Sequence, residues 1–151
     1  MATCTIDSSD YLFNRPYVRM LAAGDEMAAR KLRLEYLAHT SAEINYYAAL
    51  NKQVAGYEPP QVMLLHDNRL NADVMEQVLM LFEEKHYQFV SLDRAQSDGI
   101  YRTPDTDITG YGPMWGYRWA RERNVKVNGS LEPEPPKWIL EYGQASATRT
   151  Q

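Results

Sequence analysis

Cysteine and histidine are scarce in this chain of 151 residues. Cys4 is the only cysteine, so no disulfide can form within the chain, and cysteine usage leaves the redox compartment undetermined. The three histidines occur without any HxxxH, HExxH or CxxC spacing. Because zinc sites commonly use these spacings, we expect no metal site and no other cofactor in this chain.

Long apolar runs and clusters of basic residues are also missing. No apolar stretch approaches the roughly 20 residues that a membrane span needs, so we expect no membrane partner. Polar and acidic residues at positions 7–10 precede any apolar core of a signal peptide, which makes a cytoplasmic location the default expectation. Sixteen basic and twenty acidic residues give a net charge of -4 without a Lys/Arg cluster, so we expect no nucleic-acid partner.

Three apolar segments, 2–6, 61–66 and 87–92, are predicted to be strands. The run 61–66 shows no alternation, which is typical of a strand buried on both faces of a parallel sheet. Helices are predicted over residues 11–23, 25–56, 71–86 and 94–97. Strand, helix and strand joined by tight connections indicate parallel pairing, so the expected fold class is α/β. Pro16 should lie in the first turn of its helix or break it.

The last third of the chain is richer in turn residues. Gly112 and Pro113 open a predicted helix that carries Trp115 and Trp119 one turn apart. Residues 143–151 are small and polar, which predicts disorder. We therefore divide the chain into a domain over 1–100, an extension over 101–142 packed on it, and a disordered tail over 143–151.

His66 is the first candidate for chemistry, because it ends the buried run 61–66. In parallel α/β folds, ligands bind beyond the carboxyl ends of the strands, and a histidine there can transfer protons near neutral pH. Asp7 and Asp10 follow the segment 2–6 in the same way. If the two strands are neighbours, these carboxylates and His66 share one rim, where a carboxylate could orient the imidazole. Two simpler alternatives stay open: His66 bonded into its loop, and Asp7 or Asp10 capping the next helix.

The remaining histidines and the aromatic residues carry weaker signals. His39 lies mid-helix and His86 ends a helix, and neither has neighbours at metal-ligand spacing. Eleven tyrosines and three tryptophans could stack on sugars, although residues such as Trp115 and Trp119 more often anchor a helix to the core.

Four segments resemble motifs of the polysaccharide deacetylase (NodB homology) family. The run Val62-Met-Leu-Leu-His-Asp67, with 68–73 after it, is similar to the last conserved motif. Residues 87–95 (YQFVSLDRA) resemble the closing strand and helix, and 5–14 (TIDSSDYLFN) resemble the fourth motif, with Tyr11 where tryptophan is common. The similarity continues through 101–105 and 113–121, so it spans about residues 3–121 in the family's order.

This resemblance implies a fold and an activity. Family members are metal-dependent hydrolases on a distorted (β/α) barrel that remove acetyl groups from N-acetylated sugars. The chain would be the C-terminal part of such a barrel, with a long helix and a helical or irregular C-terminal extension. By the same resemblance His66 is the general acid that protonates the departing amine. Asp7 and Asp10 are then supporting carboxylates, and Leu64 and Tyr11 line the pocket of an amino-sugar glycan.

The motifs of the family's N-terminal half do not occur in this sequence. The base and the metal ligands come from TFDDG-type and HxxxH-type motifs, so a divalent metal such as zinc is expected only in the full-length domain. A complete barrel takes roughly 250 residues, and three predicted strands fall far short of it. We therefore expect the chain to be inactive alone. The alternatives are a non-catalytic glycan-binding remnant, and a partial barrel completed by self-association or by a complementary N-terminal half.

Overall fold

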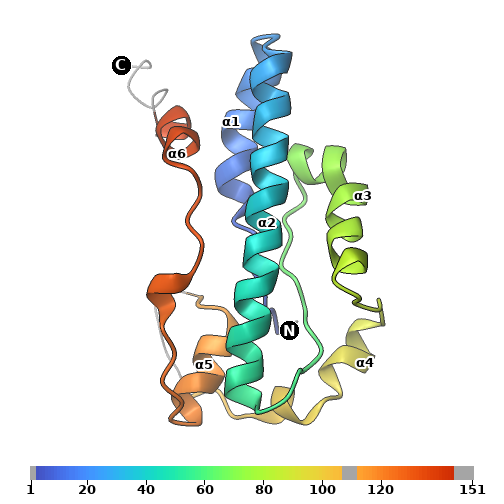
Figure 1. Ribbon diagram of the computed structural model, residues 1–151, viewed down its shortest axis with the longest axis vertical. Coiled ribbons are helices and arrows are strands. Elements are labelled where there is room, and N and C mark those ends of the chain that lie inside the picture. The colour runs from blue at the N-terminus through green and yellow to red at the C-terminus, as the bar shows by residue number, and fades with distance from the viewer. Residues whose placement is uncertain (1–2, 107–111, 145–151) are drawn as a thin grey trace. The chain divides into compact units, whose positions relative to one another are not determined.

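The computed structural model in Figure 1 describes residues 3–106 and 112–144, most of which are helical. The α-helices of this part of the chain are α1 (Asp10–Ala22), α2 (Glu26–Ala55), α3 (Arg69–Glu84), α4 (Leu92–Gln96), α5 (Trp115–Glu122) and α6 (Lys137–Gln144). Two short 3-10 helices, η1 (Gly99–Arg102) and η2 (Gly129–Leu131), complete the regular structure. None of the described helices combines the length and the apolar composition needed to cross a membrane.

The predicted α/β partial barrel is wrong. Residues 3–106 and 112–144 form neither a strand nor a sheet, and their β-type pairing is an isolated parallel bridge between Ile6 and Met63. Beside this bridge the Leu64 N–H donates to the Ile6 carbonyl at 2.9 Å, and the Thr5 N–H donates to the Val62 carbonyl at 2.7 Å. The first two predicted strands are therefore extended neighbours, but their pairing is too short to make a sheet.

The third predicted strand, 87–92, shows why no sheet forms. A strand of a parallel sheet is buried on both faces, whereas Phe89, Val90 and Leu92 are 58%, 47% and 45% exposed. Leu92 already belongs to α4, whose N-cap Ser91 accepts a hydrogen bond from the Arg94 N–H. A short apolar run does not distinguish a strand from an extended connection between helices. Here it is the connection from α3 to α4.

The two longest predicted helices, over 25–56 and 71–86, are confirmed as α2 and α3. Gly24 and Gly56 border α2 with φ values of 69° and 85°, a left-handed conformation that glycine adopts at little cost. The Asp25 side chain accepts a hydrogen bond from the Ala28 N–H at 2.9 Å and so caps the start of α2.

Pro16 departs from its prediction, because it lies inside α1 and does not break the helix. Proline has no N–H, so α1 loses one backbone hydrogen bond at this position. Pro16 is buried together with Phe13, Tyr17 and Met20 on the apolar face of the helix. Burial of this face offsets the lost hydrogen bond.

The chain divides into two compact units. The first unit comprises Met1–Asp7, Glu43–Leu64 and Gln88–Glu132, and the second comprises Ser8–Ala42, Leu65–Tyr87 and Pro133–Gln151. Helix α2 contributes its N-terminal part to the second unit and its C-terminal part to the first. The domain boundary expected at residue 100 stays a prediction. Of the predicted disordered tail, residues 145–151 lie outside the described residues, while 143 and 144 end α6.

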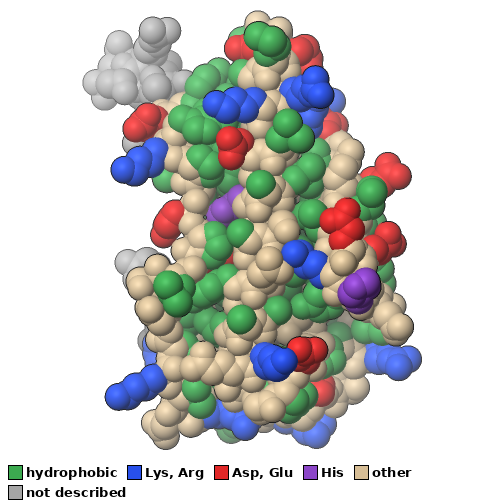
Figure 2. Space-filling model, viewed as in Figure 1, with side chains coloured by type: hydrophobic (Ala, Val, Ile, Leu, Met, Phe, Trp, Pro, Cys, Tyr) green, Lys and Arg blue, Asp and Glu red, His purple; other side chains and the backbone are tan. Residues whose placement is uncertain are grey.

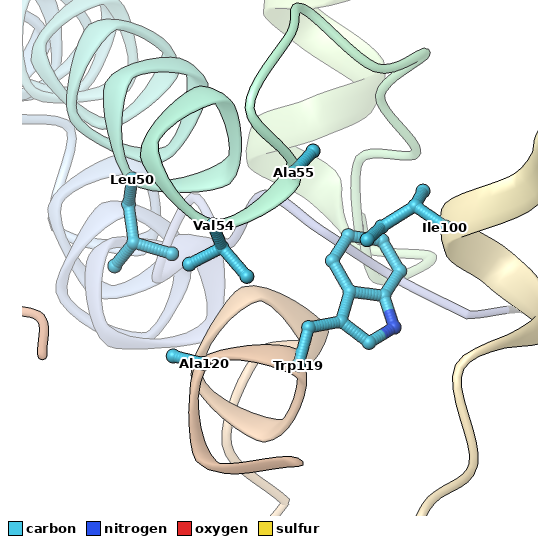
Figure 3. Close-up of a cluster of buried hydrophobic side chains, with 6 residues drawn as sticks. All are labelled: Leu50, Val54, Ala55, Ile100, Trp119 and Ala120. Atoms are coloured by element: carbon cyan, nitrogen blue, oxygen red, sulfur yellow. The ribbon is translucent and has the colours of Figure 1, made fainter. Parts of the chain in front are cut away.

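The core of the first unit lies between the end of α2 and α5. Figure 3 shows the Trp119 ring of α5 turned toward Ile100, with Val54 and Ala55 at the neighbouring end of α2. The Trp119 side chain is fully buried, and its ring meets the Tyr101 ring edge-on at 5.1 Å. The helix that carries Trp115 and Trp119 is therefore anchored to this core by its aromatic residues, the alternative to sugar stacking given by the sequence analysis.

In the second unit, α1 contacts both α3 and α6. Helix α3 buries Val74, Val78 and Phe82. Figure 2 shows acidic side chains gathered over this helix, which includes Asp73, Glu76, Glu83 and Glu84. This division into an apolar and an acidic face is the pattern that predicted the helix.

Candidate functional site

The candidate site lies in the second unit, where the first residue of α1 meets the turn that leads into α3. Asp10 begins α1, and its side chain is fully buried. Ser9, the residue before it, has a left-handed φ of 52°, which is uncommon for a residue other than glycine. His66 lies two residues before Asn68, the N-cap of α3. Two segments far apart in the sequence therefore place a carboxylate against an imidazole.

The Asp10 carboxylate accepts four hydrogen bonds. Its Oδ1 accepts from the His66 ring nitrogen Nδ1 at 2.6 Å. Its Oδ2 accepts from the His66 backbone N–H at 2.8 Å and from Asn68 Nδ2 at 2.9 Å. Asn71 Nδ2 is the third donor to Oδ2. Oδ2 is therefore fully engaged, and Oδ1 accepts from the imidazole.

The contact with Asp10 indicates which nitrogen of the His66 ring carries a hydrogen. An ionised carboxylate can only accept, so Nδ1 must carry a hydrogen when it bonds to Oδ1. The other ring nitrogen, Nε2, bonds to none of the described residues. The His66 side chain is 49% exposed, whereas that of Asp10 is 0% exposed. The pair thus has a buried carboxylate and an accessible imidazole, the arrangement by which a carboxylate orients a proton-transferring histidine.

Tyr11 lies beside this pair on α1. Its ring centroid is 5.8 Å from that of His66, with the planes inclined at 67°. The Tyr11 side chain is 55% exposed, so an aromatic surface is available next to the imidazole. The residue following His66, Asp67, is also exposed.

The structure thus brings together three of the residues singled out by sequence, His66, Asp10 and Tyr11. Asp7 and Leu64 belong to the first unit, and their predicted roles stay predictions. Comparisons with protein-family models, with curated proteins and with solved structures found no match to this chain.

The residues present do not fit a metal ion. Within 3–106 and 112–144 there is no group of three or more His, Cys, Asp or Glu side chains that could hold one. The Asp10 carboxylate is surrounded by four N–H donors, whose partial positive charges disfavour a cation beside it.

Sequence reasoning missed the asparagines that hold the site together. Asn68 Oδ1 accepts from the Asn71 N–H at 2.9 Å, which caps α3. Asn14 Oδ1 accepts from the Leu70 N–H at 3.0 Å, which ties α1 to the first turn of α3. An asparagine ahead of an amphipathic helix is a recognisable N-cap signal, so the role of Asn68 could have been predicted. No sequence pattern identifies Asn14 or Asn71.

A second polar cluster, also missed, lies in the first unit around Glu132. Tyr47 donates to Glu132 Oε1 at 2.5 Å and Tyr117 donates to Oε2 at 2.6 Å. The Tyr46 and Tyr117 hydroxyls are 2.6 Å apart. Burial, and then the hydrogen bond to Glu132, raises the pKa of Tyr47 and Tyr117. Both oxygens of the Glu132 carboxylate are engaged by the hydroxyls of this cluster, and we assign it a structural role.

Proposed function

We propose that this chain supplies the proton-donating part of a hydrolytic site that removes acetyl groups from amino-sugar glycans. The observation that carries the proposal is the 2.6 Å contact between the buried Asp10 carboxylate and Nδ1 of the half-exposed His66 ring. The order of motifs around His66 resembles that of polysaccharide deacetylases, which gives the reaction class.

In this proposal His66 protonates the amine that leaves when the amide bond breaks. The proton comes from Nε2, while Nδ1 keeps its hydrogen bond to Asp10. Asp10 holds the ring in one orientation through this bond. General acid catalysis of this kind contributes about 10²–10⁴-fold.

A proton donor alone does not make a hydrolase, because the water that attacks the carbonyl also needs a base or a metal ion. Within the described residues, no group of three or more His, Cys, Asp or Glu side chains could hold a metal ion for that step. The chain alone is therefore expected to be inactive, and activity is expected only when another polypeptide supplies the missing groups.

The test is deacetylation of a chitooligosaccharide with added zinc. The chain is assayed alone and mixed with the N-terminal half of a polysaccharide deacetylase. We expect turnover only in the mixture, and the His66→Asn variant should lower it about 10²-fold or more. His86→Asn is the matched control, because His86 is exposed, lies at the end of α3 and has a φ of 62° that asparagine tolerates. Turnover that is equal in H66N and H86N would refute the proposal, as would no turnover in the mixture.

Glycan binding without catalysis is the second candidate function, and the exposed Tyr11 ring favours it. Aromatic rings pack against the apolar faces of sugars. Binding of the chitooligosaccharide that Tyr11→Ala weakens and H66N leaves unchanged, without turnover in any mixture, would favour this function over catalysis.

A further inference from the structure

We propose that Asn71 and Tyr36 are positioning residues that determine which nitrogen of His66 is presented to a substrate. The inference rests on the role proposed for His66 above, and it extends the site to α2. Neither residue is exposed to solvent, since Tyr36 is 0% and Asn71 is 2% exposed. They act only through Asp10 and His66.

Asn71 holds both members of the pair. Its Nδ2 donates to Asp10 Oδ2, and also to the His66 backbone carbonyl at 2.9 Å. One amide group therefore fixes the carboxylate and the backbone of the residue that bears the imidazole. The Asn71 N–H is itself bonded to Asn68 Oδ1, which places this side chain in the first turn of α3.

Tyr36 fixes the orientation of the Asn71 amide. The Tyr36 hydroxyl, from α2, donates to Asn71 Oδ1 at 2.8 Å. The other end of the amide faces two acceptors, Asp10 Oδ2 and the His66 carbonyl, so that end must be the NH₂ group. With the hydroxyl in place, the amide has one orientation that satisfies all its partners.

The orientation of the Asn71 amide affects the His66 imidazole through the Asp10 carboxylate. Three N–H donors engage Oδ2, so Oδ1 is the oxygen left to accept from His66 Nδ1. This arrangement favours the tautomer with hydrogen on Nδ1 and directs Nε2 away from Asp10. If the Asn71 amide turns or loses its donor, Oδ2 keeps two of its three donors, so the carboxylate is held less firmly and the preference weakens.

The test measures the tautomer of His66 by two-bond ¹⁵N–¹H correlations in the full chain labelled with ¹⁵N-histidine. The H66N variant identifies the His66 signals among the three histidines. In Tyr36→Phe the aromatic ring remains, but the hydroxyl that orients Asn71 is gone. We expect the ratio of Nδ1–H to Nε2–H forms to fall by roughly threefold to tenfold, the effect of one hydrogen bond.

Tyr17→Phe is the matched control. Tyr17 is also fully buried in the second unit, and its hydroxyl bonds to Asp73 at 2.7 Å and to Arg33 at 3.0 Å, not to Asn71. It should leave the His66 tautomer unchanged. Asn71→Asp provides a second variant, because it keeps the acceptor for Tyr36 and replaces the donor beside Asp10 with a second carboxylate. Far-ultraviolet circular dichroism checks that each variant is folded.

An unchanged His66 tautomer in folded Y36F would overturn the positioning role, even if H66N abolishes turnover in the mixture. A tautomer change in Y36F but not in Y17F supports the positioning role. That result stands even if no mixture deacetylates a glycan, in which case the proposed function alone fails. With an active mixture, Y36F should lower kcat and leave KM nearly unchanged, since the buried Tyr36 side chain does not touch the substrate.

Discussion

Replacing Gly116 with alanine tests the packing of the first unit most directly. A Cβ atom at this position of α5 would lie 2.1 Å from Asn51 Oδ1 and 2.4 Å from Leu50 Cδ2. Asn51 is fully buried, and its Nδ2 donates to the Thr5 carbonyl at 3.1 Å and to Gln61 Oε1 at 2.7 Å. The asparagine therefore cannot move away without losing these bonds. Gly116 is required because α5 approaches α2 so closely.

The expected cost follows from two contributions. Overpacking a core costs about 1–3 kcal/mol, and weakening one hydrogen bond of Asn51 adds about 1 kcal/mol. We expect Gly116→Ala to lower the free energy of unfolding by about 3 kcal/mol and the Tm by roughly 6–12 °C. Urea denaturation monitored by Trp fluorescence measures the change, with the slope m unaltered.

Gly112→Ala is the control for Gly116→Ala. A Cβ atom at Gly112 meets no atom of the described, non-adjacent residues within 4 Å, so its effect should stay within about 0.5 kcal/mol. If both variants unfold at the same urea concentration, α5 does not pack against α2 as described, and the argument from Gly116 fails.

Two further predictions concern buried polar groups. Asp10→Ala removes the acceptor of four N–H donors of the site and should cost about 3–5 kcal/mol in urea denaturation. Asp10→Asn keeps one acceptor oxygen and should cost clearly less; equal costs would contradict the network. Burial raises the pKa of Tyr101 to about 12 and also raises that of Tyr47. Because the unfolded chain releases these protons near pH 10, this stabilisation is complete below pH 10 and is lost as the pH rises toward and beyond 12. Urea denaturation at increasing pH and tyrosinate absorbance measure the loss. Constant stability above pH 10 would refute this prediction.

The helices were predictable from sequence because their signals are local. The period of Val74, Val78 and Phe82, and the glycines at 24 and 56, depend only on residues close in the chain. Whether a sheet forms could not be predicted in this way, because a strand is stable only when it pairs with a neighbouring strand. The extended segments around Ile6 and Met63 do meet in parallel, but the bridge stays isolated and 87–92 stays exposed.

The candidate site was predictable in part for the same reason. Asp10 and His66 each follow one of two extended segments, and parallel neighbours bring their following residues to the same end. That inference needed only the order of segments. The roles of Asn71 and Tyr36 depend on how α2 and α3 pack in the second unit, and no local pattern records that packing.

The hydrogen bonds of Asp10 separate a structural from a chemical role for His66. A buried carboxylate is costly unless donors surround it, and a residue needed only to begin α1 could remain in water. Three donors to Oδ2 come from the backbone N–H of His66 and from Asn68 and Asn71, and they join α1 to the start of α3 without the imidazole. The imidazole is the fourth donor, and it is the only one whose side chain is half in solvent. Joining the helices does not require that contact, whereas a proton donor that must keep one orientation while facing a substrate does.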